Sequence, residues 1–133
     1  AFDKDGITLC NIGDSKVFLF SEDLLTQISY DHVGIAVFGK KPPLSQNLGI
    51  PEDEMIIEPY VANGGCQTGN VYLICSDVLT AEPILMFFLL LPISEAAKQL
   101  LEEALRNGGR DNITLILLYV SKQKRSLLGF LKR

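Results

Sequence analysis

The segment ITLILLYV, residues 113–120, constrains the fold more than any other part of this sequence. Its apolar residues fall on both faces of an extended chain, so a strand made from it has to be covered on both sides. A chain of 133 residues is long enough to build the covering layers within a single domain. The segment therefore predicts a layered domain with this strand in the middle of a sheet.

Five other segments have the apolar pattern and the turn-residue boundaries of β-strands. They are GITLCNI (6–12), KVFLF (16–20), LLTQIS (24–29), EMIIEPY (54–60) and NVYLICS (70–76). Short turns at 13–15 and 21–23 join the first three, which predicts an antiparallel meander. A glycine-rich turn is expected at 63–69. Residues 31–53 predict a loop, because Pro42 and Pro43 prevent a continuous helix.

One helix is clearly marked, in SEAAKQLLEEALRN at 94–107. Ser94 is expected to cap it, Glu95 suits its first turn and Gly108 its end. One face of this helix is apolar and should pack against a sheet. It is formed by Ala97, Leu100, Leu101, Ala104 and Leu105. Residues 78–92 stay ambiguous, and their apolar run is too short to span a bilayer. The whole pattern predicts an α+β domain, an antiparallel β-sandwich flanked by helices.

The charge distribution excludes some classes of partner. All sixteen acidic residues lie at or before Asp111, and residues 1–121 carry a net charge of −9. This argues against nucleic-acid binding, which needs a basic face, and suits a protein that gathers divalent cations. The basic segment 122–133 is interpreted as a solvated tail or linker, with a membrane-surface or partner contact as the alternative.

The cysteines and the start of the chain indicate where such a protein acts. Cys10 and Cys75 lie in apolar runs and Cys66 has no paired spacing, so free thiols in a reducing cytoplasm are expected. The chain starts without Met, and its start shows neither a signal segment nor a transmembrane segment. It is therefore expected to be a fragment.

Acidic residues stand at the ends of three predicted strands. Asp77 directly follows one strand, Asp111 precedes the strand at 113–120, and Asp14 lies in a turn. If the first two strands are antiparallel neighbours, Asp77 and Asp111 meet at one sheet edge, where two carboxylates repel unless they share a proton or a cation. Magnesium and manganese favour such oxygen ligands. The alternative is that these aspartates are ordinary turn and cap residues.

Five motifs, in order along nearly the whole chain, resemble those of the type-2C metal-dependent protein phosphatases (the PPM family), and the bacterial branch most of all. They are NIGDSKVFLF (11–20), ISYDH (28–32), LSQNLGIPEDEMIIEPYV (44–61), GNVYLICSDVLT (69–80) and ALRNGGRDNITLILLYV (104–120). The resemblance covers the C-terminal part of that catalytic domain. It implies two stacked antiparallel sheets between helices, and hydrolysis of phosphoserine and phosphothreonine in phosphorylated proteins with magnesium or manganese.

The resemblance also implies roles for particular residues. Asp77 and Asp111 would ligate a metal ion directly, and Asp14 would contribute to a third, weaker metal. Asn112 and Ser76 would support these ligands from behind. His32 matches a structural position of the family, and a histidine with satisfied hydrogen bonds is the preferred interpretation.

The departures from the family pattern matter as much. The chain has no counterpart of the N-terminal acidic ligands or of the arginine that grips the phosphate. Val78 replaces a glycine, which would strain the backbone if that position needs a positive φ. Ala81 stands where many relatives carry an acid, and Lys16 replaces an arginine. Residues 1–121 are therefore expected to be a half-site, inactive without the missing N-terminal part of its domain, or alternatively a catalytically dead interaction module.

Overall fold

The computed structural model describes residues 1–3, 6–38, 40–51, 53–109 and 112–122. Within these residues the chain forms six strands and two helices. In chain order they are β1 (Ile7–Asn11), β2 (Lys16–Ser21), β3 (Leu24–Gln27), β4 (Tyr60–Gly64), β5 (Val71–Cys75), α1 (Ala81–Leu90), α2 (Ile93–Arg106) and β6 (Leu115–Tyr119). The predicted mixture of antiparallel strands and helices is confirmed.

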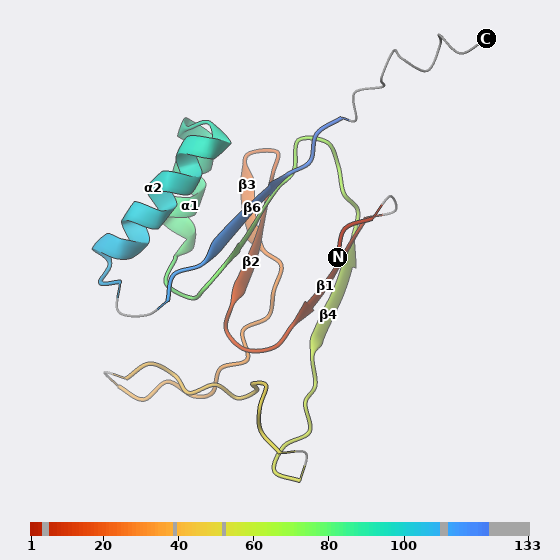
Figure 1. Cartoon of the computed structure of the whole chain (residues 1–133), viewed down its shortest axis with the longest axis vertical. Coiled ribbons are helices and arrows are strands. Elements are labelled where there is room, and N and C mark those ends of the chain that lie inside the picture. Colours follow the sequence, from red (N-terminus) through yellow and green to blue (C-terminus); the bar gives the residue numbers. More distant parts are fainter. Residues whose placement is uncertain (4–5, 39, 52, 110–111, 123–133) are drawn as a thin grey trace, which may run out of the picture.

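The strands form two sheets that face one another. The larger sheet has the order β3-β2-β5-β6 and the smaller pairs β1 with β4, with every pairing antiparallel. Side chains from both sheets, including Leu9, Leu19 and Tyr72, line a hollow of about 400 Å³ between them. Helices α1 and α2 cover the opposite face of the larger sheet, so the layers run helices, sheet, sheet (Figure 1).

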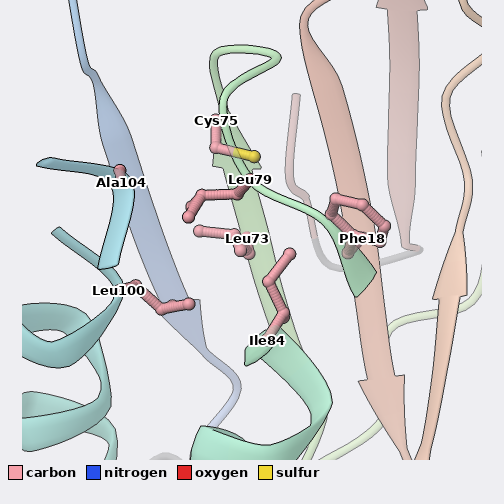
Figure 2. Close-up of a cluster of buried hydrophobic side chains, with 7 residues drawn as sticks. All are labelled: Phe18, Leu73, Cys75, Leu79, Ile84, Leu100 and Ala104. Carbon is pink, nitrogen blue, oxygen red and sulfur yellow. The ribbon is translucent and has the colours of Figure 1, made fainter. Parts of the chain in front are cut away.

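The core lies between the larger sheet and the helices (Figure 2). Its buried members are Phe18, Leu73, Cys75, Leu79, Ile84, Leu100 and Ala104. Successive side chains of β5 point to opposite faces of the sheet, so Leu73 and Cys75 face the helices while Tyr72 faces the smaller sheet. Both faces of β5 are consequently buried, and its end is held firmly in place.

Strand β6 does not lie in the middle of the described sheet, as its sequence predicts, but at its edge. It pairs with β5 on one side only. Ile116 and Tyr119 are consequently 49% and 54% exposed. The prediction was wrong for the described chain: β6 has a partner on one edge only, and only its Leu115 and Leu117 face the core beneath the helices.

The fourth strand is displaced from its predicted position. β4 begins at Tyr60 and runs through Asn63 and Gly64, which were expected in a turn. Tyr60 pairs with Asn11, and the ladder with β1 continues to Gly64. Pro59, which has no amide hydrogen, stands just before the first paired residue and suits the start of a strand.

The helices also differ in detail from the prediction. The ambiguous segment 78–92 contains a helix, α1, which buries Ile84 against the core. Ser94 does not cap α2; the helix begins one residue earlier, and the Pro92 carbonyl accepts hydrogen bonds from the amides of Glu95 and Ala96. The buried stripe is Ala96, Leu100 and Ala104, while Leu101 and Leu105 are exposed. Neither helix in the described part of the chain has the length and apolar character that crossing a membrane requires.

Candidate functional site

The end of β5 and the start of β6 meet at one edge of the larger sheet, as the sequence predicts. Cys75 pairs with Leu115 in antiparallel register. Just beyond this pair, the Ser76 amide donates to the Thr114 carbonyl at 3.1 Å, and the Thr114 amide donates to Ser76 Oγ at 3.4 Å. Ser76 therefore ties together the segments that carry Asp77 on one side and Asn112 on the other.

The turn between β1 and β2 places Asp14 at this same edge, because β2 pairs with β5 and Lys16 lies opposite Cys75. The turn is fixed from within: Asn11 Nδ2 donates to the Ser15 carbonyl at 3.2 Å, and Gly13 adopts a φ of +95°. The side chains of Asp14 and Asp77 are 21% and 24% exposed. Two half-buried carboxylates from different strand ends thus come together.

Both carboxylates bind the same cationic group, the ammonium of Lys41. Lys41 Nζ lies 3.2 Å from Asp14 Oδ2 and 2.5 Å from Asp77 Oδ2. The hydrogen bond to Asp77, followed by that to Asp14, raises the pKa of Lys41 above its usual value. The edge therefore favours a positive charge at the point where the two carboxylates converge. That preference is what an oxygen-ligated divalent cation needs, so these residues fit such an ion.

Lys41 reaches the edge on a narrow arm at 33–44, of which residues 33–38 and 40–44 are described, within the region that was predicted as a loop. Val33 and Leu44 form an antiparallel bridge, and the Gly34 amide donates to the Pro43 carbonyl at 2.8 Å. Sequence reasoning missed Lys41, because a lysine before two prolines carries no pattern that indicates contact with distant carboxylates.

Of the predicted site residues, the structure brings together Asp14, Asp77 and Ser76. Asp111 lies outside the described residues, and Asn112 is exposed. Among the described ranges no group of three or more His, Cys, Asp or Glu side chains is placed to hold a metal ion. The described part of the edge thus supplies two carboxylates of the predicted ligand set.

His32 is buried, but the interpretation of a histidine with satisfied hydrogen bonds is wrong for its side chain in the described part of the chain. It is 7% exposed, its amide donates to the Gly13 carbonyl at 3.0 Å, and its carbonyl accepts from the Ser45 amide at 2.9 Å. Its Nδ1 atom is buried and makes no hydrogen bond within the described part of the chain. The residue therefore fastens the base of the arm to the Asp14 turn mainly through its backbone.

Val78, which stands where the family resemblance implies a glycine, does not strain the backbone. Outside glycine, the described residues with positive φ are Glu22 and Asp23, in the turn between β2 and β3. Val78 is not among them, and its side chain packs against the core cluster. A β-branched residue is accommodated here because the position does not adopt the left-handed conformation.

Comparison with known proteins gives relatives in sequence and in structure, although no family model matches the chain. The chain is 30% identical over 131 residues to the serine/threonine protein phosphatase PstP of Mycobacterium tuberculosis. It is 26% identical over 128 residues to the serine/threonine phosphatase Stp of Listeria innocua. The solved catalytic domain of PstP in complex with two manganese ions superimposes with a TM-score of 0.71 at 29% identity.

The matches cover most of this chain but only part of each relative. They include 87% of the chain and 25% of PstP, and 84% of the chain and 51% of Stp. The structural match includes 91% of the chain and 56% of the PstP catalytic domain. The chain thus corresponds to a portion of a larger catalytic domain.

Proposed function

We propose that this chain, which is related in sequence and fold to part of the catalytic domain of bacterial PPM-type serine/threonine protein phosphatases, supplies one metal-binding edge of such a phosphatase. The complete domain would hydrolyse phosphoserine and phosphothreonine in protein substrates with magnesium or manganese. The observation that carries the proposal is the convergence of Asp14 and Asp77 on one cation, Lys41 Nζ. The manganese ions of the PstP catalytic domain support the choice of metal.

In this proposal each residue of the edge has a defined task. Asp77 and Asp111 ligate the metal, and Asp14 contributes a weaker interaction. Ser76 holds the two strand ends in register through its hydrogen bonds with Thr114, and Asn112 supports the segment beside it. A bound divalent ion lowers the pKa of a coordinated water and neutralises charge on phosphoryl oxygens.

We further propose that residues 1–121 form the phosphatase portion, that they need the remainder of the catalytic domain as a partner, and that 122–133 are a tail. The partial coverage of PstP and Stp supports the second point. The free cysteines agree with a cytoplasmic location. The alternative is an interaction module without catalysis, which is favoured by Ala81 at the start of α1, where the family resemblance implies an acid.

Thermal unfolding with and without manganese tests the proposal. Millimolar Mn²⁺ should raise the Tm of the chain, because a ligand that binds only the folded state stabilises it. The increase should disappear in Asp77→Asn and in Asp111→Asn. Asp53→Asn, which removes an exposed carboxylate outside the edge, serves as the matched control and should keep it.

Two results would contradict the proposal. If Mn²⁺ raises the Tm of the wild type and of all three variants equally, Asp77 and Asp111 are not the metal ligands. Manganese-dependent hydrolysis of a phosphothreonine peptide by these 133 residues alone, abolished by Asp111→Ala, would show that the chain is not a half-site but a complete enzyme.

A further inference from the structure

Resting on the proposed function, we propose that Lys41 is an internal competitor of the metal ion: its ammonium holds Asp14 and Asp77 in the metal-free protein, and a divalent cation has to displace it. Displacement frees the arm at 33–44 from its contact with the edge. Metal binding and the freedom of this arm are thereby coupled. Lys41 acts on the metal site through Asp14 and Asp77 and is a positioning residue.

The two ion pairs have the geometry that competition requires. Lys41 Nζ contacts Oδ2 of both carboxylates, so it stands where their negative potentials overlap. The Lys41 side chain is 62% exposed, whereas those of Asp14 and Asp77 are 21% and 24% exposed. An exposed lysine is readily rehydrated when it leaves, and its ion pairs are screened by solvent. The half-buried carboxylates stay at the edge to receive the incoming ion.

The arm is anchored at its base, and two large apolar side chains of its described outer part are exposed. Its base is fixed by the hydrogen bonds of His32 with Gly13 and Ser45, next to the Asp14 turn. Farther out, Ile35 and Phe38 are 89% and 105% exposed and therefore add little packing against the body of the protein. Figure 1 shows the arm projecting away from the two sheets. The ion pairs of Lys41 are thus the contact that ties the outer arm to the acidic edge.

Two prolines direct this contact. Pro42 and Pro43 follow Lys41, and a residue before proline is largely restricted to extended backbone conformations. The Lys41 backbone is therefore held in a narrow range while its long side chain keeps its rotamer freedom. The ammonium can leave the carboxylates without unfolding the base of the arm.

The first test measures manganese affinity from the electron paramagnetic resonance signal of free Mn²⁺ during titration of the full chain. Lys41→Met keeps the aliphatic length and removes the charge, and it should tighten binding by about three- to tenfold, the range expected for removing competition by exposed ion pairs. Lys40→Met is the matched control, since Lys40 is exposed and makes no ion pair with another described residue. It should bind like the wild type.

The second test follows the arm itself. Chymotrypsin can cut after the fully exposed Phe38, and mass spectrometry identifies that product. In the wild type, Mn²⁺ should accelerate this cleavage at least about threefold, in step with the same loss of ion pairs. In Lys41→Met, cleavage should already be fast without metal and should not respond to it.

The outcomes separate this inference from the proposed function. If the wild type and Lys41→Met bind Mn²⁺ equally, or if Lys40→Met tightens binding as much, competition by Lys41 is contradicted while the metal site stands. If the rate of cleavage after Phe38 changes neither with Mn²⁺ nor with Lys41→Met, the coupling between metal binding and the arm is contradicted. If none of the three proteins binds Mn²⁺, the proposed function fails, and this inference fails with it.

Discussion

Single residues at the acidic edge are positioned mostly by hydrogen bonds with the backbone. Ser76 joins the ends of β5 and β6, Asn11 closes the turn that presents Asp14, and Gly13 accepts the amide of His32. These bonds do not depend on large side chains, so they survive in a surface region with little packing. Positioning of this kind keeps carboxylates close together while leaving them accessible to an ion.

Part of this edge could be predicted at the level of residues. The sequence predicted that Asp77 meets Asp111 at one sheet edge, and Asp111 lies outside the described residues. The approach of Asp14 to Asp77 depends on the pairing of β2 with β5, which the sequence does not specify. The contact of Lys41 was not predicted either, because it depends on the path of an arm that no local pattern specifies. Whether Val78 would be strained also needed the backbone, since the sequence does not report φ.

Cys75 provides a pH prediction at this scale. Burial raises the pKa of its thiol to about 11, whereas an unfolded thiol ionises near about 8.5. Between these values the unfolded chain has lost a proton that the folded chain keeps, so the free energy of unfolding should fall as pH rises. The stability that the protonated Cys75 thiol contributes is fully present below the pKa of the unfolded chain and is lost as the pH rises through the pKa of the folded chain.

Urea unfolding at several pH values from about 8 to 11 measures this effect across the interval between the two pKa values. The raised pKa values of Lys41 and Tyr72 also make the free energy of unfolding fall as the pH rises. The quantity to compare is therefore the slope of the free energy of unfolding against pH in the wild type and in Cys75→Ala. Cys75→Ala should show a shallower loss of stability with pH than the wild type. Identical slopes in the two proteins would contradict the role assigned to the buried thiol.

At the scale of elements, α2 shows which part of an amphipathic pattern a fold uses. The structure buries one edge of the predicted stripe, Leu100 and Ala104, together with Ala96, which was not predicted, and leaves Leu101 and Leu105 exposed. Helical periodicity gives only the approximate direction of the buried face, because the rotation of the helix about its axis is set by how it packs on the sheet. The position of β4 depended in the same way on its register with β1, which its own sequence does not contain.

Two leucines of α2 test this division. Leu100→Ala removes a fully buried side chain and should lower the free energy of unfolding by about 2–5 kcal/mol. Leu105→Ala removes the same atoms from a residue that is 57% exposed. This substitution should change the free energy of unfolding by no more than about 0.5 kcal/mol. Chemical denaturation monitored by circular dichroism measures both, and similar losses would contradict the described packing.

At the scale of the whole molecule, the fold class was predictable and the position of one strand was not. The apolar pattern of 113–120 predicted a layered domain, and the layers of helices and two sheets are present, but β6 itself packs against α2 on one face while Ile116 and Tyr119 stay exposed. The pattern could not tell an inner strand from an edge strand, because that depends on a neighbour rather than on burial of the faces. The match to about half of the PstP catalytic domain is consistent with this exposed edge.

We expect a divalent cation to bind where the turn at 13–15, the end of β5 and the start of β6 meet. Paramagnetic broadening by Mn²⁺ of the amide signals of the ¹⁵N-labelled chain locates the ion directly, since broadening falls steeply with distance. We predict that signals from 13–15, 76–78 and 112–114 broaden first, while those around Glu102 and Glu103 on α2 stay sharp. Broadening centred on the acidic residues of α2, with the three edge segments unaffected, would contradict metal binding at this edge.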